Sequence, residues 1–327
     1  MREEDQRWNG LKPVVVVSQC LGFAAVRYNG AILQDDFVRA LGEHVRFVQV
    51  CPEVGIGLGV PRDPIRIVGK GSERRLLQPA TGRDVTVPMQ RFSKNFLDSV
   101  EPVDGFILKS RSPSCGIKDV KVHANIELAG TIGKSTGLFA EAVLERFPGV
   151  AVEDEGRLTN ATLRHHFLVR LFASARLREM TTDGSMAALV QFHTLHKLQL
   201  MACNQSGLRA LGRIVANAES RPARTVVADY AERFAHVMAN PARPSSNHNV
   251  LLHAFGYVSE RLSPGERKHF LKLLEDYRAG RVPLSALLAL MQSWVVRFEQ
   301  SYLSGQSFFE PYPRGLLDLT DSGSGTA

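Results

Sequence analysis

The sequence predicts an α/β fold, a Rossmann-like parallel-sheet domain, followed by an all-α domain. The chain has 327 residues, more than one compact domain usually holds. In its first half, short apolar runs rich in β-branched residues alternate with helical stretches, as in βαβ units. From about residue 161, apolar residues recur every three or four positions, which predicts helices. We therefore expect a first domain at 1–158 and a second at 159–327.

The predicted sheet begins with VVVVS (14–18), a continuous apolar run typical of a strand that is covered on both faces. The stretch 60–90 contains VPRDP, GKGSE and PATGRD, and we interpret it as an inserted loop or small β excursion. The other expected elements of this half are a helix at 31–41, a strand at 45–50, a helical stretch around 95–100, a strand at 105–110, a loop or short strand at 117–121, a helix at 136–149 and a last strand at 150–158.

The second half is expected to be helical throughout. Pro241 and Pro244 with a Ser-Ser-Asn cluster predict a break at 241–249. One helix has clear ends, because Ser263 is a good N-cap and Gly280 a good terminator. The expected helical segments are 163–180, 184–202, 226–239, 263–280 and 283–303, and the tail DSGSGTA is expected to be disordered.

Composition narrows the class of protein. No apolar run approaches the ~20 residues of a membrane helix, and the polar start MREEDQRWNG does not resemble a secretory signal. We therefore expect a cytoplasmic protein with no membrane partner. Four cysteines in so long a chain, in a reducing compartment, favour metal binding or catalysis over a disulfide framework.

Positive charge is concentrated in the second half. Residues 1–160 carry 21 Lys and Arg against 20 Asp and Glu, whereas residues 161–327 carry 19 against 13. The second half also holds eight of the ten histidines. This asymmetry favours a polyanionic partner, with nucleic acid first. A basic surface without a special partner remains the alternative.

Three cysteines each close a predicted strand: Cys20 in VVVVSQC, Cys51 in FVQVCPE and Cys115 in FILKSRSPSC. The carboxyl ends of neighbouring parallel strands meet at one crevice, so these thiols are expected to converge there. Three thiolates would leave a four-iron cluster one protein ligand short. Spacing alone favours a small buried apolar residue at each cysteine, and that is our interpretation of Cys203; the glycine and proline residues beside Cys20, Cys51 and Cys115 favour cluster ligation there.

The motifs CLG..VRYNG, CPE.GIGLGVPR.P and GFILKSRSPSCG together resemble the bacterial thiouracil desulfidase family over roughly residues 12–155. The segments FHTLHKLQLMA, HNVLLHAFGYVSERLSPGE and YLSGQSFFEPYP resemble a helical domain often fused to it. The combination is similar to the tRNA 4-thiouridine desulfidases, two-domain proteins whose second domain is expected to bind RNA.

The resemblance implies a [4Fe-4S] cluster held by Cys20, Cys51 and Cys115 as metal ligands. It also implies that the iron without a protein ligand binds the sulfur of a thiolated pyrimidine, whose ring carbon is attacked by water. The soft thiocarbonyl sulfur suits such an iron, which would act as a Lewis acid. The products are the oxo-base and sulfide, and a hydrolysis needs neither a nicotinamide nor a nucleoside triphosphate. Thiolated tRNA is the expected partner; free thiouracil or a thionucleoside as substrate, and a non-catalytic RNA-binding iron–sulfur sensor, are the alternatives.

Several residues near these cysteines are candidates for the chemistry. Glu53 is the first choice as general acid or base, and a carboxylate that only caps a helix or pairs with Arg62 is the alternative. The remaining candidates, each with a structural alternative as a turn or surface residue, are Ser112 and Ser114 for orienting water or substrate, Lys109 for sulfide or phosphate, and Arg27 and Tyr28 for gripping the base.

In the second half, His193 and His196 share one helix face with Lys197 adjacent. With Arg209, Arg213, His248, His253 and Arg261 they are expected to form a basic groove for RNA phosphates. Polar faces of core helices are the alternative. Two glycine-rich segments are set aside: TIGKST (131–136) lacks the first glycine of a phosphate loop and reads as a helix start, and GIGLGVP (55–61) is not followed by a helix.

Overall fold

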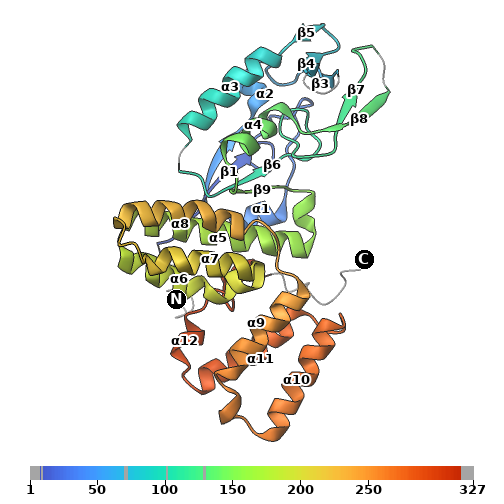
Figure 1. Ribbon diagram of the computed structural model, residues 1–327. Coiled ribbons are helices and arrows are strands. Elements are labelled where there is room, and N and C mark those ends of the chain that lie inside the picture. Colours follow the sequence, from blue (N-terminus) through green and yellow to red (C-terminus); the bar gives the residue numbers. More distant parts are fainter. Residues whose placement is uncertain (1–7, 9, 70–72, 101, 128–129, 318–327) are drawn as a thin grey trace. The chain divides into compact units, whose positions relative to one another are not determined.

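Two β-sheets form the first half of the chain in the computed structural model, which describes residues 8, 10–69, 73–100, 102–127 and 130–317. The first sheet is parallel throughout and has the strand order β2-β1-β6-β9 (Figure 1). Its strands are β1 (Val14–Ser18), β2 (Arg46–Val50), β6 (Gly105–Leu108) and β9 (Ala151–Asp154). The chain passes from β1 to β2 on one side and later to β6 on the other, so the strand order reverses beside β1. Ligands of open α/β sheets bind at such a switch point.

The second sheet is mixed and has the order β5-β4-β3-β7-β8. Its strands are β3 (Arg66–Val68), β4 (Arg75–Gln78), β5 (Arg83–Asp84), β7 (Val120–His123) and β8 (Thr131–Ser135). The predicted β excursion after residue 60 is therefore present, and it is completed by a hairpin from later in the chain. The expected helix start at GKST is wrong, because Thr131–Ser135 pair with β7 and the helix begins only at Leu138.

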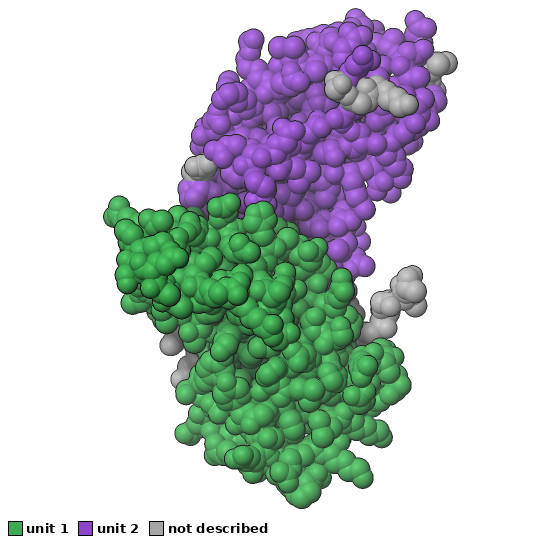
Figure 2. Space-filling model, in the orientation of Figure 1, with its two compact units in different colours: residues 1–9, 168–327 green, residues 10–167 purple. Residues whose placement is uncertain are grey.

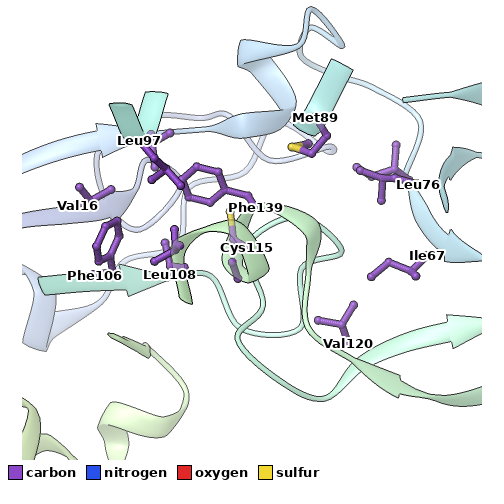
Figure 3. Packing of buried hydrophobic residues seen from close by; sticks show 14 of the residues in the cluster. Val16, Ile67, Leu76, Met89, Leu97, Phe106, Leu108, Cys115, Val120 and Phe139 are labelled. Atoms are coloured by element: carbon purple, nitrogen blue, oxygen red, sulfur yellow. The ribbon is translucent and has the colours of Figure 1, made fainter. Parts of the chain in front are cut away.

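Every residue of β1 is buried, which explains the unbroken run of valines. Val16 belongs to a core that also contains residues of the second sheet and of the helices α3 (Thr86–Ser99) and α4 (Leu138–Arg146) (Figure 3). Cys115 lies inside this core among the side chains labelled in Figure 3, including Phe139 and Leu108. Packing within this core thus holds Cys115 in place.

Two short helices follow the first two strands: α1 (Asp36–Leu41) and α2 (Pro52–Gly55). The predicted start of α1 at residue 31 is five residues too early. Asp35 is the N-cap, and its side chain accepts a hydrogen bond from the Val38 N–H at 2.8 Å. A capping carboxylate satisfies a donor that the first turn leaves unpaired, so the helix begins there.

The second half of the described chain is helical. Its helices are α5 (Ala161–Asp183), α6 (Met186–Cys203), α7 (Gln205–Ala216), α8 (Ala223–Val237), α9 (Pro244–Gly256), α10 (Pro264–Arg278), α11 (Leu284–Arg297) and α12 (Ser301–Ser304), with short 3-10 turns η3 (Arg157–Thr159), η4 (Ser259–Arg261) and η5 (Arg314–Leu316). The predicted fold class is confirmed. The predicted break at 241–249 is too long, because Pro244 occupies the first turn of α9, where its missing N–H costs nothing.

Helix α6 receives hydrogen bonds from a side chain near the C-terminus. Gln306 accepts from the Leu198 N–H at 3.1 Å and donates to the Thr194 carbonyl at 2.8 Å. These two backbone groups would otherwise bond to each other in the helical ladder. The next residue, Ser307, donates its N–H to the Leu195 carbonyl at 2.9 Å. The segment after α12 is thereby fixed onto α6.

The chain divides into two units, residues 10–167 and residues 1–9 with 168–327 (Figure 2). Both sheets belong to the first, and the division falls within α5. The expected disordered tail lies outside the described residues. Among the helices that the structure describes, none is both long and apolar enough to span a bilayer.

Candidate functional site

The carboxyl ends of β1, β2 and β6 open into a cavity of about 390 Å³ within residues 10–167. Cys20, Cys51 and Cys115 all line it, so the three thiols converge as the strand pattern predicts. All four cysteines of the chain are free thiols. The cavity falls within the usual size range of small-molecule and cofactor sites. It therefore provides a place where three sulfur ligands and a small substrate can meet.

The first two cysteines are positioned directly by their strands. Cys20 lies in the turn after β1, where the Gln19 N–H still bonds to the Val50 carbonyl at 2.8 Å. Cys51 follows β2 immediately and is the N-cap residue of α2, with extended backbone before Pro52. Each strand thus delivers its cysteine to the same edge of the sheet.

Cys115 is brought back to the cavity by a tight loop after β6. The Ser112 hydroxyl accepts from the backbone N–H groups of Ser114 at 3.2 Å and of Cys115 at 3.1 Å. Gly137 must be a glycine here, because a Cβ would lie 2.5 Å from the Ser114 carbonyl oxygen. Ser112 lines the cavity, and its hydroxyl holds the shape of the loop.

Burial raises the pKa of all three cavity thiols, so each thiol holds its proton more tightly when no metal is bound. It raises the pKa of Cys20 to about 11 and that of Cys51 above its usual value. The pKa of Cys115 is raised well above 9, by burial first and further by the nearby Cys20 and Cys51. The three thiols are close enough to influence one another's pKa, and together they form a sulfur donor set from which a metal would have to displace the protons.

The described residues hold no cluster of three or more His, Cys, Asp and Glu arranged around a single ion. An iron–sulfur cluster makes a different demand, since its cysteine ligands bind different irons and stand farther apart than the ligands of one ion. The cavity lining contains three cysteines and no histidine. The donor set therefore fits a cluster with three protein ligands.

Glu53 lines the cavity one residue beyond Pro52, and its carboxylate is held from two sides. Oε2 accepts from Arg62 at 2.7 and 2.8 Å, and Oε1 accepts from the Ser114 hydroxyl at 3.0 Å. The Glu53 side chain keeps 14% of its surface exposed, against 4% for Arg62. Ser114 itself is fully buried, so it supports Glu53 rather than facing a substrate. The pairing with Arg62 expected as an alternative is thus present on a carboxylate that also faces the cavity.

Lys109 follows β6 and lines the cavity near Cys20, whose pKa its charge lowers. Its ammonium donates to Glu155 and, at 2.8 Å, to the Ser110 hydroxyl. Glu155 also accepts from the Ser110 N–H at 2.8 Å. Burial alone would raise the pKa of Glu155, but the hydrogen bonds from Lys109 and Ser110 lower it on balance. This side of the cavity therefore carries a bound ion pair rather than a mobile lysine.

Arg27 and Tyr28 lie at the mouth of the same cavity. Tyr28 is 44% exposed, and the Arg27 guanidinium carbon lies 5.8 Å from the centre of its ring. Both side chains can therefore reach a planar ligand entering the cavity.

The residues predicted to contact RNA are distributed over several helices. His193 on α6 bonds to the Tyr230 hydroxyl at 3.0 Å, Lys197 on α6 and Arg209 on α7 are exposed, and Arg213 lines a shallow hollow with Arg233. His248 on α9 contacts Glu275 at 3.3 Å, and Arg261 in η4 donates to the Phe298 carbonyl at 2.8 Å. His193, Lys197, Arg209 and Arg213 thus belong to one helix pair, while His248 and Arg261 bind groups elsewhere.

His196 is not on the surface that we expected. It is 1% exposed, its ring stacks on Phe192, and its Nδ1 lies 3.0 Å from the Phe192 carbonyl. Burial first, and the nearby Arg176, lower its pKa to about 3, so it is neutral. Helical spacing predicted that His196 shares an exposed face with His193, but His196 packs against Phe192 and Phe234 in the core. A phosphate contact by His196 does not fit this structure.

The family described as 2-thiouracil desulfurase matches residues 15–155, which contain the cavity and its three cysteines. The uncharacterized protein YbbK of Bacillus subtilis (strain 168) is 32% identical over 156 residues, 45% of this chain and 99% of YbbK. The uncharacterized protein YbgA of Escherichia coli (strain K12) is 32% identical over 158 residues, 48% of this chain and 93% of YbgA. The chain belongs to the 2-thiouracil desulfurase family.

A second family, described as a protein of unknown function (DUF1722), matches residues 197–313. A solved structure titled [4Fe-4S]-dependent thiouracil desulfidase TudS is 30% identical and covers 45% of this chain and 94% of that chain, with a TM-score of 0.37. The two family matches confirm the resemblance of the N-terminal motifs to desulfidases at the level of the family, and the presence of a second, helical region in the same chain.

The sequence analysis missed Glu155, which holds the cavity residues Lys109 and Ser110, and Arg111, which lines the cavity itself. Glu155 comes directly after β9, so the rule that located the cysteines at strand ends also applies to it. Arg111 lines the cavity with left-handed backbone, at a φ of 58°. No sequence signal marks that conformation, because arginine rarely adopts it.

Proposed function

We propose that this protein is an iron–sulfur-dependent desulfidase that converts 4-thiouridine in tRNA to uridine and releases sulfide. The observation that carries the proposal is the convergence of Cys20, Cys51 and Cys115 on one cavity at the switch point of a parallel sheet. Membership of the 2-thiouracil desulfurase family supports the reaction class.

Cys20, Cys51 and Cys115 would hold a [4Fe-4S] cluster and leave one iron without a protein ligand. When bound, such a cluster would supply a soft Lewis acid for the thiocarbonyl sulfur. Overall, one water replaces the sulfur: the ring C=S and H₂O become C=O and H₂S. No electrons are exchanged, so the cavity needs acid–base groups rather than a redox partner.

Glu53 is suited to take the proton from the attacking water. Its carboxylate is fixed by Arg62 and Ser114, and it lines the cavity next to Cys51. A general base must be held within hydrogen-bond reach of the proton that it removes. The proton taken by Glu53 is then available for the ring nitrogen or the departing sulfur.

Lys109 would stabilise negative charge as the sulfur leaves. Glu155 and Ser110 fix its ammonium beside Cys20. Ser112, exposed to the cavity, can donate its hydroxyl hydrogen to the substrate while its oxygen accepts from the loop. Arg27 and Tyr28 at the mouth would stack on and orient the base.

The helical half would bind the tRNA through its phosphates. Residues 161–327 carry six more basic than acidic residues, and Lys197, Arg209 and Arg213 lie on the adjacent helices α6 and α7. Phosphate contacts would position the RNA without reading its sequence. The thiolated base would then have to leave its stack to reach the cavity, as in other enzymes that act on bases.

Anaerobic incubation of the cluster-loaded full chain with 4-thiouridine-containing tRNA tests the proposal. Nucleoside analysis is expected to show uridine replacing 4-thiouridine, with one sulfide released per base converted. Unchanged 4-thiouridine with no sulfide would refute the activity. Intact RNA binding with no sulfide release would instead support a non-catalytic iron–sulfur sensor.

A desulfidase of free thiouracil or a thionucleoside is the second candidate. It is favoured by one observation: the desulfurase family match ends at residue 155 and does not require the helical half. The two candidates differ in kcat/KM, which would be higher for thiolated tRNA in the first and for the free base in the second. The same full-length protein serves both measurements.

A further inference from the structure

Arg62 occupies an unusual place in the cavity wall. Its side chain is only 4% exposed, yet it carries a charge and lines the cavity beside Glu53. A buried guanidinium must have its donors satisfied, because an unpaired buried charge is costly. The groups that satisfy Arg62 therefore show what the residue holds in place.

The first of these groups is the Glu53 carboxylate. Nε of Arg62 donates to Oε2 at 2.8 Å, and Nη2 forms an ion pair with the same oxygen at 2.7 Å. The Ser114 hydroxyl takes the other oxygen, Oε1, at 3.0 Å. Because each oxygen is bound from a different side, the plane of the carboxylate is fixed. A single donor would leave it free to rotate.

The second set of groups belongs to the segment that carries Arg27 and Tyr28. Nη1 of Arg62 donates to the Val26 carbonyl at 2.9 Å, and the backbone N–H of Arg62 donates to the Tyr28 carbonyl at 2.8 Å. These two carbonyls lie on either side of Arg27 in the chain. Nη1 also donates to the Gly59 carbonyl at 3.0 Å, which fixes the loop that supplies Arg62 itself.

We propose that Arg62 is the positioning residue of the site: its guanidinium orients Glu53 for proton transfer and, through the Val26 carbonyl, holds the start of the segment that carries Arg27 and Tyr28. This inference rests on the proposed function and adds to it a residue that does not touch the reacting atoms. Arginine is the one side chain whose planar fork can serve a carboxylate and a carbonyl at the same time. Lysine keeps the charge but cannot keep this geometry.

A double-mutant cycle with Glu53 tests the inference on the cluster-loaded full chain. Arg62→Ala is expected to lower kcat for thiolated tRNA by about 10²-fold, the scale of a lost general base, while the cluster absorbance is retained. If Arg62 orients Glu53, the double variant Arg62→Ala/Glu53→Gln keeps the kcat of Glu53→Gln alone, whereas loss of the bond to the Val26 carbonyl raises the KM for thiolated tRNA in every Arg62→Ala variant. Additive losses in kcat, or an unchanged KM, would overturn the inference.

Chemical rescue gives a second readout. Millimolar guanidinium can fill the space left by Arg62→Ala and is expected to restore kcat at least about tenfold. It should not rescue Glu53→Gln. Urea, which has a similar shape and no charge, should rescue neither. Guanidinium should also raise the melting temperature of Arg62→Ala above that of the same variant in urea, since a bound ligand stabilises the folded state.

Arg62→Lys covers the case in which Arg62→Ala fails to fold or to keep its cluster. It is expected to fold and to lose kcat, and the cycle with Glu53→Gln is then run on it. Arg91→Ala, an exposed arginine on α3 that does not line the cavity, is the matched control and should behave as wild type. An active wild type with fully active Arg62 variants overturns this inference alone. An inactive wild type overturns the proposed function instead.

Discussion

Cys115 and Cys203 show how differently two cysteines of one chain can be placed: Cys115 is buried and Cys203 is partly exposed. Cys115 faces the cavity at the end of a loop that Ser112 and Gly137 hold in shape. Cys203 ends α6 in the helical half, where the Gln199 amide donates to its sulfur at 3.6 Å. Burial raises the pKa of both thiols, so their reactivity alone does not separate them. Their neighbours do.

Replacing Cys20, Cys51 or Cys115 with alanine is expected to abolish cluster binding, because two thiolates cannot hold the cluster that three are arranged to hold. The measurement is iron and acid-labile sulfide per chain, together with the visible absorbance and sulfide release. Cys203→Ala is the control and should keep all of these. A Cys203 variant without iron would mean that the ligand set has been wrongly identified.

The pair of Lys109 and Glu155 predicts a pH-dependent contribution to stability. The pKa of Glu155 is lowered in the folded state, so its contribution is complete above the ordinary carboxyl pKa of ~4.3 and is lost as the pH falls through the lowered value. Glu155→Gln should therefore destabilise the protein at pH 7, by about 1–3 kcal/mol, and the difference from wild type should narrow below about pH 4. Thermal unfolding at several pH values measures this.

Glu145→Gln is the matched control for that experiment, because Glu145 is exposed on α4. It should leave the melting temperature unchanged at every pH. A loss of stability in Glu155→Gln that stays constant from pH 7 to pH 3 would show that charge is not the cause.

The sequence predicted those site residues that follow a strand directly. Cys20, Cys51 and Lys109 could be located because a buried apolar run announces where each strand ends. Arg62 was recognised only as a possible partner of Glu53. Its bonds to Val26 and Tyr28 depend on how two loops cross, and no periodic pattern encodes such a crossing. The prediction that His196 contacts RNA was wrong, because helical spacing shows which residues share a face of a helix but not what covers that face.

At the level of elements, the predictions failed where a local pattern competed with pairing partners far away in the chain. GKST resembles a helix start, but strand β8 forms because β7 offers it hydrogen-bond partners.

Helix α7 was not predicted as a separate element. Asn204 caps its first turn, with the side chain accepting from the Gly207 N–H at 2.9 Å. That cap follows α6 directly, so the periodic pattern gave little sign of the boundary.

The contact between α4 and the Cys115 loop makes a testable demand on one glycine. A Cβ at Gly137 would lie 2.5 Å from the Ser114 carbonyl oxygen, and backbone cannot yield as a flexible side chain does. Gly137→Ala should therefore push the loop away from the cavity and destabilise the protein by about 1–3 kcal/mol. Thermal unfolding and iron content after reconstitution measure the two effects.

Gly133 on β8 provides the matched control, because a Cβ there would meet nothing within 4 Å. Gly133→Ala should keep wild-type stability and iron content. Equal behaviour of the two variants would show that the close approach at Gly137 does not constrain the loop.

On the scale of the whole molecule, the chain joins a near-neutral half that holds the cavity to a basic half. With His196 buried and His248 and Arg261 engaged elsewhere, the cations left on α6 and α7 are Lys197, Arg209 and Arg213. The proposed RNA contact is thus narrower than the charge excess of the half suggests. The proposed RNA contact involves three residues, and each can be replaced separately.

The affinity of the full chain for tRNA should fall steeply as salt rises, because each neutralised phosphate releases bound counterions. Arg209→Ala and Arg213→Ala should each weaken binding and reduce the slope of log K against log salt by about 1, as measured by filter binding or fluorescence anisotropy over a salt series.

Turnover of free 4-thiouracil supplies the internal control: it uses the cavity but no phosphate, so neither salt nor these substitutions should change it. A tRNA affinity that does not change with salt would contradict the proposal that the helical half binds RNA phosphates. A slope that persists unchanged in both variants would place the phosphate contacts on other residues of the chain.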